Sequence, residues 1–435
     1  MASDQASPLL TTLVFLPALG GLVVTIVGRR RDALVPWLAV LFAGFTFVLA
    51  VWVLGDAKGG GLSELHAWVP ALGVSFILES DWLSSVLVVW VTLSTLLTLI
   101  STLPGLRTVV PVLFLETAAN GIFLAQDVFL VFAFLGVVMV AVALLTSVPR
   151  NVLLFATAGL TALFGWFVRF YQMVYAQTGF ASTELTRWRS LVLYPDEERS
   201  LFLLGAGGIA LLVPAFAIAA DNAPRAHRLV LFATVGVIGS YLVLRLLVPL
   251  CPRGAEASSS WVLASAALLM ASAWRARGWT FMAVGYHGLV LFGLFTFQES
   301  VVVGAELMMI AVAIGFFGLV LTTSRRLVLY FVLFLIGMPI VSVLVPAWEG
   351  DALRSSFGTL TFLMMAYRFV TLAKASPPME NVENESRRPI LAAATVVLLS
   401  ASMILGWGAW AAKVRPSAID FINSSSAWPA RPAQP

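Results

Sequence analysis

The sequence has very little cysteine and histidine. One cysteine, Cys251, occurs among 435 residues. A single thiol excludes an internal disulfide framework, iron–sulfur ligation and a cysteine zinc site. The three histidines, His66, His227 and His287, are far apart along the chain and show no metal-ligand spacing. We therefore expect no metal site, no catalytic residue set and no redox cofactor within this chain.

Charge is also scarce. Only 11% of the residues are charged, against about 25% in an average soluble domain. The chain is 60% hydrophobic, its mean hydropathy is +0.96, and long apolar runs recur along its whole length. This pattern predicts an all-α polytopic membrane protein. The basic residues fall in short loops, which favours a role in membrane orientation and not a nucleic-acid partner.

The apolar runs predict about fourteen transmembrane helices of roughly 17–25 residues each. The first run follows MASDQASP, which lacks a basic segment, so we expect a retained first span and not a cleaved signal peptide. The expected ranges are 9–28, 33–54, 83–103, 108–126, 127–147, 151–175, 200–220, 227–250, 260–274, 279–298, 300–323, 327–346, 355–374 and 389–412.

The charges in the loops between these ranges predict the orientation. With the N-terminus outside, basic residues mark the cytoplasmic loops: Arg29–Arg31, Arg107, Arg150, Arg225, Arg228, Arg275, Arg277, Arg325, Arg326, Lys374, Arg387 and Arg388. Acidic residues mark the outer loops: Asp56, Glu64, Glu79, Asp81, Asp196–Glu198, Glu299, Glu349 and Asp351. The positive-inside rule then places both termini outside, in the periplasm if the membrane is a bacterial inner membrane.

Three segments outside the spans have a recognisable character. Residues 55–82 include HAWVPALGVSF, whose alternation fits a short strand or an interfacial segment, and residues 176–199 are polar with mixed charge. Residues 413–435 are rich in Ser, Ala and Pro and predict a periplasmic tail, either loose or lying as a strap over its neighbours. Residues 1–412 are therefore expected to form a single transmembrane domain.

Several stretches between residues 10 and 375 resemble the antiporter-like membrane subunits of complex I, most closely the chain M or subunit 4 type. They are ESDWLSSVLVVWVTLSTLLTLIST, LFLETAANGIFLAQDVFLVFAF, APRAHRLVLFATVGVIGSYLVLRLLVPLCP, WRARGWTFMAVGYHGLVLFGLF and LMMAYRF. The resemblance implies fourteen helices, inverted repeats at roughly 108–250 and 260–374, and a broken seventh helix at Val213-Pro214. It also implies other membrane subunits of a respiratory or ion-translocating complex as partners, besides lipids.

The family is thought to move protons along buried ionisable residues, and this sequence departs from that pattern. The fifth-helix Glu of the family falls at Gly136, and the Lys positions of the seventh and eighth helices fall at Ile209 and Val237. The eleventh-helix stretch MMIAVAIGF has no Lys or His, and the twelfth, FVLFLIGMPIVSVLV, has no ionisable residue. The only three lysines are Lys58, Lys374 and Lys413, in loops or at span ends. A lysine-based relay is therefore excluded.

Four ionisable residues remain as candidates for a proton path or an intramembrane polar site: Glu116, His287, Glu306 and Arg245. An intramembrane carboxylate suggests function by default, yet Glu116 fits a neutral side chain bonded to another helix equally well. His287 matches a family residue on the central axis, although a packed neutral histidine is the simpler interpretation. Glu306 fits a contact with a neighbouring subunit as well as proton transfer. Arg245, like Arg169 and Arg368, lies near a span end and fits a structural, snorkelling role.

Two other features concern the backbone. Pro214 and Pro339 lie inside expected helices, and such breaks expose backbone carbonyls in transporters. The stretch GAGGIA at 205–210 resembles a phosphate-binding loop, but it lies within a span and lacks the strand and lysine of that motif. Its small residues are expected to allow close helix packing instead.

Three hypotheses for function follow. The first is a chain M-like, non-catalytic membrane subunit of a complex I-like respiratory assembly, structural and with a degenerate proton path. The second is a proton- or cation-translocating subunit of a redox-driven pump, a cation/proton antiporter or an inorganic-carbon uptake complex. The third is an independent channel or transporter. The residues alone leave these alternatives open.

Overall fold

The computed structural model of the protein describes residues 8–57, 61–146, 150–221, 223–272, 279–322, 325–348, 352–375 and 388–426. Nearly all of them are helical. The long helices are α1 (Leu9–Gly28), α2 (Val35–Asp56), α3 (Trp82–Thr102), α4 (Leu106–Leu124), α5 (Val128–Leu145), α6 (Arg150–Thr178), α8 (Pro195–Asp221), α9 (Arg225–Leu242), α12 (Ser259–Ser272), α13 (Trp279–Leu294), α14 (Glu299–Leu321), α15 (Arg325–Pro339), α17 (Ala352–Ala375), α18 (Arg388–Leu405) and α19 (Trp407–Ser426).

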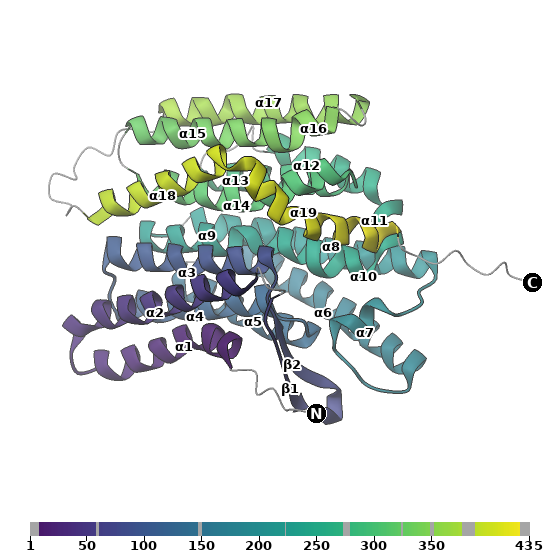
Figure 1. Ribbon diagram of the computed structural model, residues 1–435, viewed down its shortest axis with the longest axis horizontal. Helices are drawn as coiled ribbons and strands as arrows, with labels where there is room; N and C mark the ends of the chain where they lie inside the picture. The colour runs from purple at the N-terminus through teal and green to yellow at the C-terminus, as the bar shows by residue number, and fades with distance from the viewer. Residues whose placement is uncertain are drawn as a thin grey trace, which may run out of the picture.

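The helices lie side by side along one direction, with α1 and α2 at one edge of the bundle and α15 and α17 at the other (Figure 1). Within the described residues, ten helices are long and apolar enough to cross a membrane, and a bent pair makes up to eleven. Three shorter apolar helices lie within the expected ninth, tenth and thirteenth spans. The expectation of an all-α polytopic protein with about fourteen spans is therefore confirmed.

The short segments outside the spans gather at one end of the bundle. A hairpin of β1 (Ser63–Val69) and β2 (Val74–Glu79) lies there with α7 (Leu185–Arg189) and α11 (Pro252–Ala257). In Figure 1 the hairpin is at the bottom, right of centre, and α7 and α11 are at the right. The strand alternative for residues 55–82 is confirmed. The hairpin turns at Gly73, whose φ of 65° is one that glycine adopts without strain. The carbonyl oxygen of Gly73 accepts a hydrogen bond from the amide of Thr183 at 3.1 Å, which joins the turn to the loop before α7.

Asp127 organises the connection between α4 and α5. Its carboxylate accepts hydrogen bonds from the amides of Phe129 and Leu130 at 2.8 and 3.3 Å, and so caps the N-terminus of α5. It also accepts from the amide of Ser75 at 3.1 Å and from the hydroxyl of Thr183 at 2.6 Å. Burial raises the pKa of this carboxyl, and the four hydrogen bonds lower it in part. One side chain therefore holds a helix start, the hairpin and the α7 loop together.

The expected break in the seventh helix is wrong for this chain. Helix α8 is continuous from Pro195 to Asp221, through Pro214. It is held along α6, because Gly159 and Gly208 let the two backbones approach closely: a Cβ on Gly159 would lie 2.8 Å from the Gly208 carbonyl oxygen. The expectation of close packing at GAGGIA is thus met at Gly208.

The helix irregularities lie elsewhere, in the eighth and twelfth spans. Helix α9 runs into a π-helical segment, η4 (Val243–Leu247), and then into α10 (Val248–Leu250); α15 runs into η6 (Ile340–Leu344) and α16 (Val345–Trp348). Pro249 and Pro346 follow the two π segments at the same offset. A proline ring clashes with the carbonyl four residues earlier, which is that of Arg245 or Ser342, so the wider π turn relieves the clash.

The C-terminal segment forms a helix, whereas a loose tail was one of the two expected alternatives. Helix α19 (Trp407–Ser426) follows α18 with a bend of 79°. It buries Val414, Ala418 and Phe421 against the bundle and packs beside α14. These three residues recur at helical spacing, which explains why the segment forms one apolar stripe. Residues 413–426 therefore match the strap alternative, while 427–435 lie outside the described residues.

Candidate functional site

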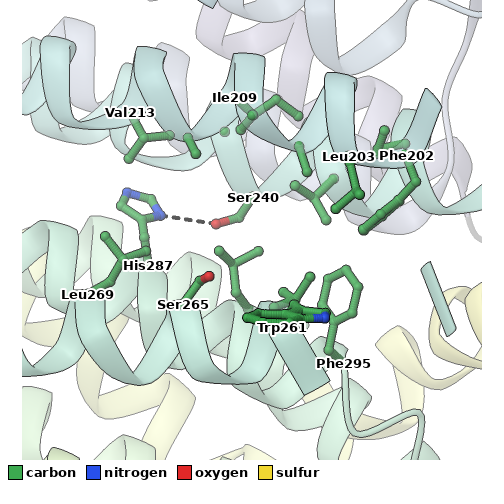
Figure 2. A pocket seen from close by; sticks show the side chains of 18 residues that line it. Phe202, Leu203, Ile209, Val213, Ser240, Trp261, Ser265, Leu269, His287 and Phe295 are labelled. Carbon is green, nitrogen blue, oxygen red and sulfur yellow. Dashed lines mark hydrogen bonds between the residues drawn. The ribbon is translucent and has the colours of Figure 1, made fainter. Parts of the chain in front are cut away.

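His287 lies in α13 at the inner end of a cavity of about 280 Å³ between α8, α9, α12 and α13. Its side chain is 7% exposed. The Nδ1 atom lies 3.0 Å from the hydroxyl oxygen of Ser240 on α9, which Figure 2 shows as a dashed line. The rest of the lining is almost entirely apolar, with Val213 and Leu269 beside the ring. The histidine is thus a buried, hydrogen-bonded side chain in an apolar cavity.

The position where the family would place its seventh-helix lysine lines the same cavity. Ile209 on α8 is buried and contributes to the wall that faces His287. Val237 on α9 is also buried, at 2% exposure, but does not line the cavity. A lysine at position 209 would therefore line the same cavity as the imidazole. In this chain an aliphatic side chain occupies it.

Arg245 and Glu306 form a second charged site, near the end of the bundle that carries the hairpin. Arg245 lies in η4 and pairs with the Asp81 carboxylate, which caps α3 through the amide of Ser84 at 2.7 Å. Its guanidinium also interacts electrostatically with Glu306 on α14 and with Asp420 on α19. Glu306 is fully buried. Two of the candidate residues are thus close enough to interact electrostatically, and Asp81 and Asp420 add two more charged residues.

Glu116 lies apart from both groups. It is fully buried in α4, and neither carboxyl oxygen has a hydrogen-bond partner among the described residues. Asn120 lies one helical turn further on, is equally buried, and is likewise without a partner for its amide atoms in that part of the chain. Gly136, where the family carries its fifth-helix glutamate, faces open space on α5: nothing lies within 4 Å of a Cβ placed there.

No group of three or more His, Cys, Asp or Glu that could hold a metal occurs within the described ranges. The sequence did not point to Ser240, Asp81 and Asp420 as members of the two sites. Ser240 lies five residues before Arg245 on the same span, yet only the packing of α13 on α9 brings it to His287. Asp81 and Asp420 come near Arg245 in the same way, because α3 and α19 pack close to α9 and its extension.

No protein-family model matches the chain. Among curated proteins, an NAD(P)H-quinone oxidoreductase chain 4 from Picosynechococcus is 31% identical over 153 residues, which are 32% of this chain and 28% of that protein. A second chain 4, from Trichodesmium erythraeum, is 30% identical over 151 residues, or 27% of its length. The match thus spans little more than a quarter of these relatives. NADH-quinone oxidoreductase subunit M of Rickettsia conorii is 23% identical over 341 residues, or 70% of this chain and 68% of that one.

Solved structures share the fold over almost the whole chain. A chain of respiratory complex I from Thermus thermophilus has a TM-score of 0.82 and 18% identity, and covers 96% of this chain and 99% of its own. A chain of the Mrp complex from Dietzia has a TM-score of 0.76 and 14% identity, with 98% and 99% covered. The chain therefore shares the fold of membrane chains from these complexes. An archaeal membrane-bound sulfane sulfur reductase contains another similar chain, with a TM-score of 0.75, 14% identity, and 96% and 100% covered.

The chain shares this fold, and its interior differs from what the family resemblance implies. The cavity that holds His287 carries Ile209 in place of the lysine that the resemblance implies. The buried carboxylates, Glu116 and Glu306, lie on α4 and α14 and not on α5, where Gly136 stands. The ionisable residues thus form separated sites: Glu116 alone, His287 with Ser240, and Glu306 with Arg245.

Proposed function

We propose that the chain is a structural membrane subunit of a complex I-like respiratory assembly, and that its own proton path is incomplete. The observation that carries this proposal is the apolar wall around His287. A proton crosses a membrane by hopping between groups of suitable pKa, and it needs water or polar side chains between them. Around His287 the described lining offers Ser240 and Ser265 with aliphatic and aromatic side chains, and Ile209 replaces the lysine position.

The proposal also covers the partners of the chain, the membrane it occupies and its orientation there. Its structural neighbours are chains of multi-subunit membrane complexes. We infer that this chain also packs against other membrane subunits and lipids, with inverted repeats at roughly 108–250 and 260–374. We further propose a bacterial inner membrane with both termini in the periplasm, since the acidic loops gather with the hairpin and α7 at one end of the bundle.

The test uses the native membrane complex, with its other subunits in place. His287→Ala and Glu116→Gln are introduced separately, and the ratio of protons moved to electrons transferred is measured in sealed vesicles. A structural subunit predicts an unchanged ratio in both variants once assembly is matched. A lower ratio in either variant at unchanged subunit content would refute an incomplete path.

A second function is favoured by one specific observation. Glu116 and Asn120 are fully buried, one turn apart, with no hydrogen-bond partner among the described residues. Buried polar groups without partners cost free energy unless water or an ion satisfies them. This arrangement favours translocation of a proton or cation through α4 in a redox-driven pump, a cation/proton antiporter or an inorganic-carbon uptake complex. The Glu116→Gln measurement separates the two functions directly.

A further inference from the structure

The cavity beside His287 opens sideways out of the bundle. Helices α8 and α12 both pack on α13 and form the two lips of the opening. Leu203 on one lip is 47% exposed and Trp261 on the other is 68% exposed. Gly207 lies on the α8 lip, and nothing is found within 4 Å of a Cβ placed there. The opening therefore faces the hydrocarbon that surrounds a membrane helix bundle.

The cavity extends along the helix axes. Its wall on α8 runs from Phe202 to Val213, which at about 1.5 Å per residue is roughly 16 Å. In Figure 2, Phe202, Trp261 and Phe295 gather at one end, and Val213 and His287 lie at the other. The hydrocarbon core is about 30 Å thick, so one leaflet is about 15 Å. The cavity thus extends over one leaflet, from near the hairpin end of the bundle to its middle.

The end of the cavity near the hairpin side carries interfacial chemistry. Arg199 lies three and four residues before Phe202 and Leu203, and hence on the same face of α8. It is exposed, and it takes part in none of the ion pairs found among the described residues. Trp261 stands on the opposite lip, and tryptophan side chains are enriched where the membrane meets water. A cation and an indole therefore flank the end of an apolar slot.

We propose that the cavity binds one acyl chain of a phospholipid from the leaflet on the hairpin side, with the phosphate group at Arg199. The apolar walls match an acyl chain, the lateral opening admits it from the membrane, and the guanidinium attracts the phosphate. An isoprenoid quinone fits less well. Its two ring carbonyls need hydrogen-bond donors on both sides, and most of the lining is apolar. The proposal is independent of whether the chain moves protons.

The experiment measures lipid retention by the full-length chain in its complex. The complex is purified in a delipidating detergent and titrated with phosphatidylglycerol or, separately, with ubiquinone, and bound ligands are counted by native mass spectrometry. We expect one tightly held phosphatidylglycerol in the wild type. Gly207→Leu fills the opening and should weaken retention by about tenfold or more. Arg199→Gln should weaken phosphatidylglycerol binding and leave that of phosphate-free diacylglycerol unchanged.

Gly165→Leu on α6 is the matched control, because Gly165 is also exposed with nothing within 4 Å of a Cβ position. It should retain the lipid as the wild type does. If Gly207→Leu disturbs folding, the test is whether Arg199→Gln weakens the binding of phosphatidylglycerol but not that of diacylglycerol. Equal retention in wild type, Gly207→Leu and Arg199→Gln would overturn the proposal. So would preferential retention of ubiquinone, or a side chain of a neighbouring subunit filling the slot in the assembled complex.

Discussion

The imidazole of His287 and the hydroxyl of Ser240 join α13 to α9 across 3.0 Å inside the membrane-spanning bundle. Most of the cavity around this pair is lined by apolar side chains. In such surroundings a hydrogen bond is strong and an unmade one is costly. The pair therefore has a structural role that does not depend on titration of the histidine.

Ser240→Ala tests this role. The change leaves the Nδ1 of His287 without its partner, and an unsatisfied buried polar atom costs about 1–3 kcal/mol. We expect a lower midpoint of thermal unfolding in detergent. Ser265→Ala is the control, since Ser265 lines the same cavity but is exposed, and such surface changes stay within about 0.5 kcal/mol. Equal midpoints for the two variants would argue that the His287 contact contributes nothing.

Ile209→Lys restores the residue type that the family resemblance implies at this position. A charge buried among apolar side chains costs several kcal/mol unless it is paired, and no carboxylate lines this cavity. We expect reduced stability and no gain in proton transfer by the assembled complex. Ile209→Met keeps the volume and the apolar character, so it should behave as the wild type. A gain in proton transfer with the lysine would show that the rest of the path is intact.

Replacing Arg245 alone should destabilise the protein more than replacing Arg245 and Glu306 together. Arg245→Met removes the cation that acts electrostatically on the buried Glu306 and that also pairs with Asp81. Breaking a fully buried pair costs about 3–5 kcal/mol, so we expect a loss of stability up to that size. The double variant Arg245→Met/Glu306→Gln removes both charges and should regain part of that loss. The measurement is a double-mutant cycle of unfolding midpoints in detergent. Strict additivity of the single effects would mean that the two side chains do not interact.

Hydropathy alone predicted the spans well, because helices in a membrane must be long and apolar whatever their neighbours. The boundary expected between residues 126 and 127 agrees with the start of α5, where Asp127 caps the helix. The prediction of a broken seventh helix was wrong for a physical reason. A proline disturbs a helix only as far as the surrounding packing permits, and α8 continues through Pro214 while it packs along α6. Pro249 and Pro346 instead coincide with π turns.

The sites were predicted less completely than the spans. Glu116, His287 and Glu306 are buried as expected for intramembrane ionisable residues. Their partners are not visible in the sequence, because Ser240 and Asp420 reach them through contacts between distant helices. Helix α19 was not predicted, because residues 413–435 are rich in Ser, Ala and Pro. Its signal was the spacing of Val414, Ala418 and Phe421, which places them on one face.

Phe421→Ala should loosen helix α19. The ring is 3% exposed and stacks on Phe297 at 5.9 Å between centroids, and large-to-small core changes of phenylalanine cost about 3–5 kcal/mol. Arg415→Ala removes an ion pair of 2.5 Å with Glu299 in which both side chains are well exposed, so it should cost at most about 1 kcal/mol. Limited proteolysis of the assembled complex measures both. Faster cleavage at α19 in Arg415→Ala than in Phe421→Ala would contradict this ranking.

The orientation of the bundle can be measured with introduced cysteines, because the single native thiol, Cys251, is fully buried. Thr186→Cys lies exposed on α7 at the hairpin end, and Arg30→Cys lies exposed beyond the C-terminus of α1 at the other end. In intact spheroplasts, a membrane-impermeant maleimide should label Thr186→Cys at once and Arg30→Cys only after the membrane is opened.

The expected direction rests on the positive-inside rule, because loops rich in arginine stay on the cytoplasmic side of the membrane. Wild-type protein, carrying only Cys251, should remain unlabelled and so reports the background. The reverse pattern would place the hairpin, α7 and α11 in the cytoplasm. It would also move the proposed phospholipid site at Arg199 to the inner leaflet, because that residue lies on the same end of α8 as the hairpin.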